Sequence, residues 1–129
     1  MTIFSKIISG EIPSYKIAED ENYYAFLDIR PLNAGHTLVI PKVEIDYIFD
    51  LDNTTYLELM KFSKQIATAI KLAIPCERVS MQVIGLEVPH THVHLIPIVT
   101  TNDCNFANTK LKFTKEEFEN TAQLIAQKL

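Results

Sequence analysis

The 129-residue chain lacks most features that would place a protein outside the cytoplasm. Its first residues contain no long apolar stretch of the kind found in signal peptides, and no segment approaches the roughly 18 apolar residues that span a bilayer. The two cysteines, Cys76 and Cys104, form no C-x-x-C pair, and we interpret them as reduced thiols. We therefore expect a cytoplasmic protein that has no membrane partner.

The chain also lacks a cluster of lysine and arginine, and its formal net charge is −4. Because nucleic-acid binders usually carry a basic face, we expect no nucleic-acid partner, whereas backbone amides and histidines could still hold a small anion. Repeats, low-complexity segments and Gly/Ser-rich or Pro-rich linkers are absent as well. With 47% hydrophobic residues, the sequence predicts a single globular domain over residues 1–129.

Apolar spacing and breaker residues predict the order of the secondary structure elements. We expect a short helix over residues 3–9 that ends at Gly10, strands over 15–18, 23–28 and 36–40, a helical turn over 47–51, a long helix from Asp52 or Asn53 to about Ala73, strands over 79–84 and 92–99, and a final helix that begins at Thr114. The last helix has a capping-box signature, Thr114 followed by Glu117. This order favours the α+β class, with an antiparallel sheet and helices packed on one side of it.

Three of the four histidines, His90, His92 and His94, fall at alternate positions within five residues. Side chains of a strand alternate between its faces, so the three rings are predicted to project from one face, about 6–7 Å from one to the next. Val93 and Leu95 would point to the opposite face and join the core. An exposed strand needs no imidazole to be polar, so this row of rings indicates a chemical site.

The spacing alone leaves three interpretations of the histidines open. Neutral imidazoles bind zinc, and His36 on a neighbouring strand could add a ligand. Against a metal site, residues 95–101 lack the Glu that a cupin-like metal-binding pattern requires. Imidazole is also a nucleophile when neutral and a proton donor near neutral pH, which suits catalysis on phosphorus. The third interpretation is a pH-sensing or anion-binding module without turnover.

The segment from His90 to Ile96 resembles the His-φ-His-φ-His-φ-φ motif of the histidine triad (HIT) superfamily of nucleotide hydrolases and transferases, with Thr91 in a usually apolar position. Residues 3–13 resemble the N-terminal segment of that family, and residues 25–31 and 35–42 resemble its nucleoside-binding strands. These similarities cover most of residues 1–98 in the same order. The resemblance implies a five-stranded antiparallel sheet with two main helices, and a symmetric homodimer.

The resemblance further implies a site for a purine nucleotide, with no cofactor and no metal. Phe4, Ile7, Ile12 and Ile29 would line the base pocket, although plain core packing accounts for these four residues equally well. Asp28 would accept hydrogen bonds from the ribose hydroxyls, a role that suits an ionised carboxylate.

In the mechanism that the resemblance implies, His92 attacks the α-phosphorus and forms a nucleotidyl-histidine intermediate. A backbone carbonyl that accepts its Nδ1–H would leave Nε2 free to attack. His94 would donate to a phosphate oxygen, and His90 and His36 would assist the leaving group and proton transfer. Water would then release the nucleoside monophosphate, and no metal is needed.

The residues before the triad depart from the family pattern. Gly85 can let the backbone approach the phosphates, but Leu86 stands where the family usually has Gln, and Glu87 replaces a hydroxyl found in many members. A carboxylate near an anionic leaving group is unfavourable, which mildly favours phosphoramidates over polyphosphates. Thr2 and Ser5 occupy the positions through which some members hold a structural zinc with C-x-x-C, so we expect no such zinc.

These observations lead us to expect a purine nucleoside phosphoramidase or nucleotide hydrolase that acts at the α-phosphate. The alternatives are a nucleotide-binding regulatory protein with little turnover, a dinucleoside polyphosphate hydrolase, and a metal-binding protein that uses His36 and the triad.

Overall fold

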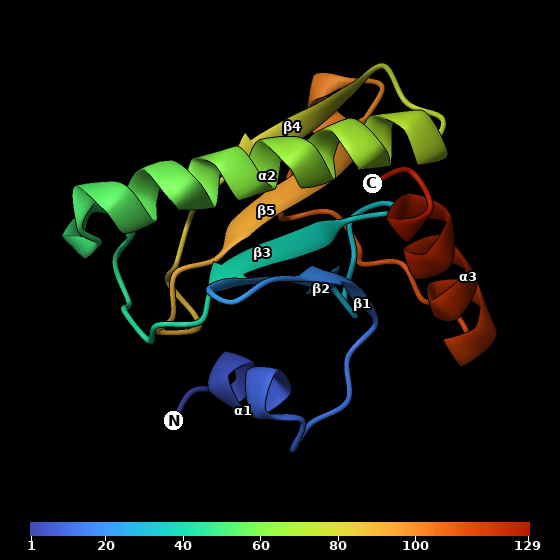
Figure 1. The fold of residues 1–129 in the computed structure, drawn as a ribbon. Helices are drawn as coiled ribbons and strands as arrows, with labels where there is room; N and C mark the ends of the chain where they lie inside the picture. The colour runs from blue at the N-terminus through green and yellow to red at the C-terminus, as the bar shows by residue number, and fades with distance from the viewer.

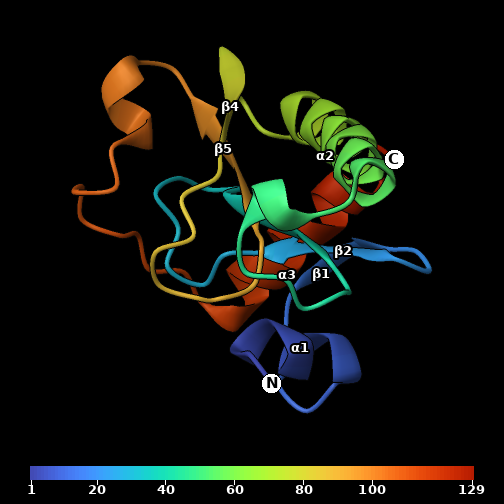
Figure 2. The same cartoon turned by 90° about the vertical axis from the view of Figure 1, so that its left-hand side faces the viewer.

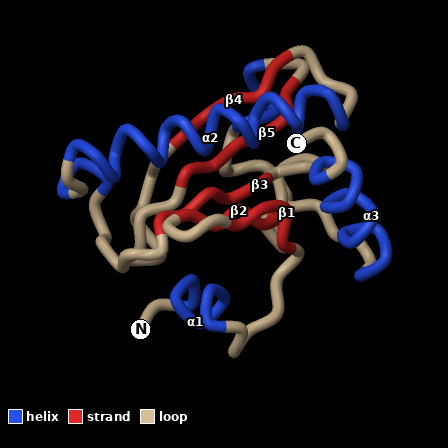
Figure 3. Tube along the Cα trace, viewed as in Figure 1, coloured by secondary structure: helices blue, strands red, loops and turns tan.

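The computed structural model describes residues 1–129 and contains one five-stranded sheet and three α-helices (Figures 1 and 3). In chain order the elements are α1 (Ile3–Ser9), β1 (Lys16–Glu19), β2 (Tyr23–Leu27), β3 (Thr37–Pro41), the 3₁₀ helix η1 (Ile48–Asp50), α2 (Asn53–Ala73), β4 (Arg78–Gln82), β5 (Val93–Ile98), the 3₁₀ helix η2 (Thr101–Cys104) and α3 (Lys115–Ala126). The α+β class and the five antiparallel strands are confirmed. Each helix is too short or too polar to cross a membrane.

The strands do not follow one another in the sheet as they do in the chain. Their order is β1-β2-β3-β5-β4, and every neighbouring pair is antiparallel. Strand β5 therefore lies between β3 and β4, in register with β3 through the pair Leu38 and His94. This pairing brings the chain around residue 36 beside the chain around residue 94, and it leaves β1 and β4 as the two edges.

Helices cover both faces of the sheet, so the expectation of helices on one side is wrong for α1 (Figures 1 and 2). Helices α2 and α3 share the main core, a cluster of 17 buried side chains that includes Val93 and Leu95 as predicted. Helix α1 packs against the opposite face, where Phe4 and Ile7 join four buried side chains of β2 and β3. The reason is that α1 itself carries an apolar stripe, which needs a sheet face of its own.

The helices begin and end at residues with specific capping roles. Gly10 takes the left-handed conformation (φ 86°) that ends α1, and the Asp52 carboxylate accepts a hydrogen bond from the Thr55 N–H at the start of α2. The predicted capping box of α3 is present, with Thr114 and Glu117 bonding to each other's backbone N–H. Local sequence thus determines where each helix begins or ends.

The strand that carries the triad begins later than predicted. It was expected over residues 92–99, but β5 starts at Val93, and only His94 of the triad lies within it. The Thr91 N–H and hydroxyl both bond to the carbonyl oxygen of Ile45, each at 2.7 Å, rather than to a neighbouring strand. Residues 90–92 are therefore diverted from the sheet toward the connection between β3 and η1.

Candidate histidine site

The four histidines are buried, with exposed fractions of 0% to 8%. His36 directly precedes β3 and His94 lies on β5, so the pairing of these two strands places their rings in contact, with His36 Nε2 3.0 Å from His94 Nδ1. The rings of His92 and His94 meet edge to face with centroids 5.0 Å apart. Three of the four imidazoles therefore form one continuous group.

Hydrogen bonds determine which nitrogen of His36 and of His94 carries the proton. The Leu32 N–H donates to His36 Nδ1 at 3.0 Å, so the proton of a neutral His36 ring is on Nε2. That Nε2–H donates to His94 Nδ1, which places the His94 proton on Nε2. Burial lowers the pKa of His36 to about 3 and the pKa of His94 to about 4, so both rings are neutral at pH 7. The chain of bonds thus ends in an N–H donor on His94.

His92 has the opposite tautomer from His94. Its Nδ1 lies 2.8 Å from the carbonyl oxygen of His90, and because a carbonyl only accepts, Nδ1 carries the proton. In the neutral ring the Nε2 lone pair is then free. The predicted backbone carbonyl partner of His92 is therefore present. A nucleophilic nitrogen on His92 stands beside a ring whose N–H can donate to an anion.

Like His36, and unlike His92 and His94, His90 has both of its ring nitrogens bonded to other protein atoms. Its Nε2–H donates to the carbonyl oxygen of Pro41 at 2.8 Å, and its Nδ1 lies 2.9 Å from the hydroxyl oxygen of Thr2. The Phe4 ring contacts the rings of both His90 and His92, with centroids 5.8 and 5.0 Å away. The part predicted for His90 in proton transfer would require one of its two hydrogen bonds to break.

Asp28 lies beside His36 at the edge of this group of imidazoles, with a side chain that is 20% exposed. Its Oδ1 accepts from the Arg30 N–H at 2.9 Å, and its Oδ2 is 3.6 Å from His36 Nε2. Burial raises the pKa of this carboxyl group. Ligand atoms of Asp28, His36 and His94 lie within 4.8 Å of one another, a set that could hold a divalent cation. Such a cation would have to replace the proton that joins His36 to His94.

The residues predicted to contact the base fall into two groups. Phe4 and Ile7 are buried in the cluster under α1, and Ile12 is packed against that cluster, half-buried. Ile29 stands apart in the connection between β2 and β3, with 67% of its surface exposed. Phe4 and Ile7 therefore have a packing role in this structure, and Ile29 is open to contact with a ligand.

The residues predicted to approach the phosphates lie in the loop between β4 and β5. Gly85 has a φ of 72°, and a Cβ added there would meet no atom within 4 Å. This left-handed conformation favours glycine, and the open space leaves the backbone accessible. Leu86 is 89% exposed and Glu87 is also exposed, so neither side chain is packed into the site.

Two parts of the site could not be recognised in the sequence. Thr2, Ser5 and Glu44 form a polar cluster around the far side of His90. Phe106 lies beyond residues 1–98, which carry the resemblance, yet its ring packs on His94 with centroids 4.9 Å apart and on His36 at 6.1 Å. The contacts of Thr2 and Ser5 with Glu44 and His90, and those of Phe106 with the histidines, join segments far apart in the chain. No local sequence pattern reports them.

The sheet order and the arrangement of imidazoles are those of a histidine triad domain. A family model described as the HIT domain matches residues 9–101, and the chain belongs to this family. It is 35% identical to a HIT-like protein of Borreliella burgdorferi, over 98% of this chain and 97% of that protein.

Two further relatives extend the comparison. The chain is 41% identical to the adenosine 5′-monophosphoramidase HNT1 of Saccharomyces cerevisiae, over 74% of this chain and 61% of that protein. It also superposes on the crystal structure of a Hit-like protein from Bartonella henselae with a TM-score of 0.86 and 32% identity, covering 99% of this chain and 96% of that one. The family is thus shown both by sequence and by fold.

Proposed function

We propose that this protein is a purine nucleoside phosphoramidase or nucleotide hydrolase that acts at the α-phosphate through a nucleotidyl-histidine intermediate on His92. The observation that carries the proposal is the pairing of a free Nε2 lone pair on His92 with a neutral His94 whose Nε2–H points out of the hydrogen-bonded chain. The similarity to a yeast adenosine 5′-monophosphoramidase supports the same substrate class.

The reaction proceeds in two displacements at phosphorus. In the first, the bond from His92 Nε2 to phosphorus forms while the bond from phosphorus to the leaving group breaks, and the amine nitrogen takes up a proton from solvent water as it leaves. The imidazolium formed on His92 is stabilised by its Nδ1–H bond to the His90 carbonyl oxygen. In the second, water attacks phosphorus while the bond from phosphorus to His92 Nε2 breaks, the water proton returns to solvent, and the nucleoside monophosphate and neutral His92 are released. Two easier steps thus replace one difficult step.

His94 contributes a preorganised hydrogen bond to a phosphate oxygen. Because its Nδ1 accepts from His36, its Nε2–H cannot change sides without breaking a buried bond. A neutral donor held in this way stabilises the charge that develops on phosphate oxygen and loses little energy to reorganisation. His36 therefore acts by holding the tautomer and the ring of His94.

The nucleoside would lie between Asp28 and the apolar residues near α1. In this proposal the Asp28 carboxylate accepts from the ribose hydroxyls, and Ile29, Ile12, Phe4 and Ile7 border the purine. The Gly85 backbone, free of close neighbours, approaches the phosphates. Glu87 is exposed and is solvated by water, which weakens its repulsion of an anionic leaving group, so dinucleoside polyphosphates are included among the substrates to be tested.

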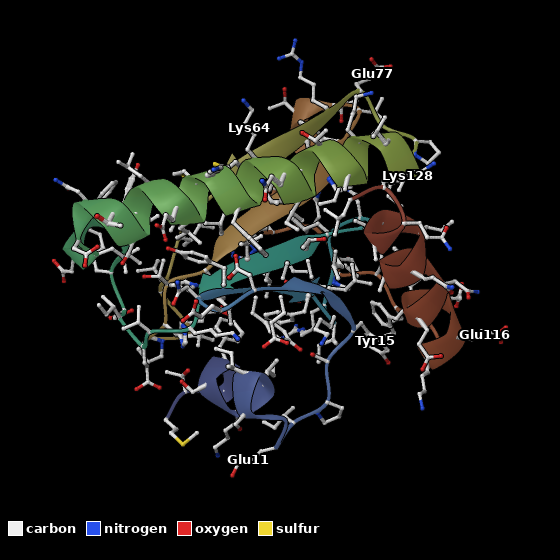
Figure 4. All side chains as sticks on the ribbon, in the orientation of Figure 1. Glu11, Tyr15, Lys64, Glu77, Glu116 and Lys128 are labelled. Carbon is white, nitrogen blue, oxygen red and sulfur yellow. The ribbon has the colours of Figure 1, made fainter.

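The experiment is to incubate the protein with adenosine 5′-phosphoramidate and measure AMP by chromatography. Wild type is expected to release AMP, His92→Ala is expected to lose this activity, and Glu11→Gln is the control, since Glu11 points away from the body of the protein (Figure 4). Equal release by wild type and His92→Ala would refute the role of His92. Absence of release by wild type, with dinucleoside polyphosphates also left intact, would refute the enzyme.

A second candidate is a nucleotide-binding regulatory protein with little turnover. The departures at Leu86 and Glu87 favour it, because neither side chain offers a donor to the leaving group. Calorimetry with AMP separates the two candidates. Tight binding of AMP, together with no turnover of phosphoramidates or dinucleotides, would establish the regulator.

We also propose that the protein is a cytoplasmic homodimer. The outer edge of β4 has no strand partner, and half-exposed apolar side chains (Met81, Val83 and Ile84) lie on and just after it. Such an edge is a template for pairing with another chain. Sedimentation analysis is expected to give twice the mass of one chain for wild type and the mass of one chain for Met81→Lys. A monomeric wild type would contradict the proposal.

A further inference from the structure

Two polar side chains at the start of α1, Thr2 and Ser5, meet Glu44 of a distant segment beside His90. Glu44 Oε1 accepts from the Thr2 backbone N–H at 2.6 Å and from the Ser5 hydroxyl at 2.7 Å. The hydroxyl oxygen of Thr2 accepts from the Ser5 N–H at 3.1 Å and lies 2.9 Å from His90 Nδ1. We call Thr2, Ser5 and Glu44 the N-terminal latch, because they tie the first turn of α1 to the triad.

The direction of each bond in the latch follows from its chemistry. The Glu44 carboxylate can only accept, and its two donors hold the pKa of this carboxyl group below the ordinary value. His90 Nε2 faces the Pro41 carbonyl and must carry the proton, so His90 Nδ1 is an acceptor. The Thr2 hydroxyl therefore donates to His90, since its other neighbour, the Ser5 oxygen, is more distant at 3.3 Å. Every group in the cluster has a defined partner.

The latch is connected to the proposed nucleophile by two short routes. The carbonyl oxygen of His90 accepts the Nδ1–H of His92, so a rotation of residue 90 moves the group that orients the His92 ring. Phe4, on the first turn of α1, packs its ring against both His90 and His92. Displacement of this turn would therefore loosen the packing around His92 and the backbone that holds it.

By resemblance, Thr2 and Ser5 of the latch stand at the two positions through which some members of the family hold a zinc ion with C-x-x-C. The residues of this chain do not fit that ion, because Thr2 and Ser5 offer neutral hydroxyls instead of thiolates, and zinc prefers sulfur and nitrogen ligands. Both hydroxyls and the imidazole are moreover already engaged in hydrogen bonds. Hydrogen bonds therefore hold Thr2, Ser5, Glu44 and His90 together here.

We propose that the N-terminal latch is a metal-free device that fixes the rotation of the His90 ring, whose tautomer the Pro41 carbonyl sets, and, through the His90 carbonyl oxygen, the orientation of His92. Thr2 and Glu44 are positioning residues for the reaction and contact no substrate. Only the kinetic part of the test rests on the proposed function, since the hydrogen bonds can be observed directly.

The first measurement is a two-bond ¹H–¹⁵N correlation spectrum of the imidazole rings in protein carrying its tag at the C-terminus. Wild type is expected to show His90 with its proton on Nε2 and His92 with its proton on Nδ1. In Thr2→Val the Nδ1 resonance of His90 is expected to shift toward the value of a nitrogen without a hydrogen bond, and the His92 signals to move with it. Thr2→Ser keeps the hydroxyl and is expected to restore both.

The second measurement is steady-state kinetics with adenosine 5′-phosphoramidate. Thr2→Val and Glu44→Ala are expected to lower kcat about tenfold and leave KM within about twofold, because misplacement of a nucleophile affects the reaction more than binding. Glu44→Gln keeps an oxygen acceptor and is expected to retain most of the activity. Asp52→Ala, which removes the cap of α2 and whose carboxylate accepts from the Thr55 N–H, is the control for general loss of stability.

Defined outcomes would overturn the proposal. A wild-type His90 with its proton on Nδ1 would do so, as would a folded Thr2→Val protein whose His92 signals and kcat match wild type. If Thr2→Val fails to fold, Glu44→Ala decides by the same two measurements. If wild type releases no AMP, the proposed function fails and the spectra alone decide whether the latch sets His90 and His92.

Discussion

The neutral state of His36 and His94 predicts that acid destabilises the folded protein in a defined range of pH. Both groups have an ordinary pKa of 6.5, which burial lowers to about 3 for His36 and about 4 for His94. Between pH 6.5 and pH 4 the unfolded chain therefore binds two protons that the folded chain does not. The stability that the two neutral histidines contribute is fully present above pH 6.5 and is lost as the pH falls below that value.

The magnitude follows from the size of the two pKa shifts. Each proton changes the free energy of unfolding by about 1.4 kcal/mol per pH unit, so His36 and His94 together remove about 4 kcal/mol between pH 7.5 and pH 5. Burial lowers the pKa of His90 as well, which acts in the same direction. Since small domains have a total stability of about 5–15 kcal/mol, this loss is easily measured.

The assay is urea unfolding at intervals of half a pH unit from pH 7.5 to pH 5. In wild type each of the two histidines contributes about 1.4 kcal/mol per pH unit to the slope of the free energy of unfolding against pH. His36→Gln is expected to lower this slope by at least the contribution of one histidine. Ile66→Val is the matched control: it removes a buried methylene from α2, at a cost of about 1 kcal/mol, and should leave the slope unchanged. A flat profile for wild type, or equal slopes for wild type and His36→Gln, would refute the neutral hydrogen-bonded chain.

Three further predictions concern other parts of the molecule. The double variant Thr2→Cys/Ser5→Cys places two thiols beside the imidazole of His90 and the carboxylate of Glu44, and metal analysis is expected to find about one zinc per chain in the variant and none in wild type; a zinc-free variant would show that the four groups are too far apart for one ion. Asp28→Asn is expected to reduce the preference for adenosine over 2′,3′-dideoxyadenosine phosphoramidate about tenfold in kcat/KM, and an unchanged preference would remove Asp28 from the ribose site. Thr114→Ala is expected to lower the free energy of unfolding by about 1 kcal/mol in urea with kcat unaltered, whereas no loss of stability would mean that the α3 capping box contributes nothing.

The elements that local sequence determines were predicted well. The end of α1 at Gly10, the cap of α2 at Asp52 and the capping box of α3 at Thr114 each depend on residues within one turn of the helix end. The alternation of Val93 and Leu95 toward the core was also readable, because a strand has a fixed period of two. Such features need no knowledge of the rest of the fold.

The site was predicted less completely because its key contacts join segments that are far apart. The four histidines were recognised, but the bond between His36 and His94 depends on β5 being inserted next to β3, which no local pattern reports. The hydrogen bonds of Thr91 to the carbonyl of Ile45 keep residues 90–92 out of β5, although the strand was predicted to begin at His92. Glu44 is an ordinary exposed carboxylate in the sequence, and only the position of α1 gives it partners.

The insertion of β5 between β3 and β4 also has a consequence for how the chain reaches its native state. His36 and His94 are 58 residues apart, and their contact requires the ends of that long segment, including all of α2 and β4, to be brought together. Closing such a loop costs conformational entropy that local contacts do not repay, so pairings of this kind form slowly. The helices can form early, because their contacts are local. The hydrogen-bonded chain of imidazoles can form only after β5 has paired with β3 in the middle of the sheet.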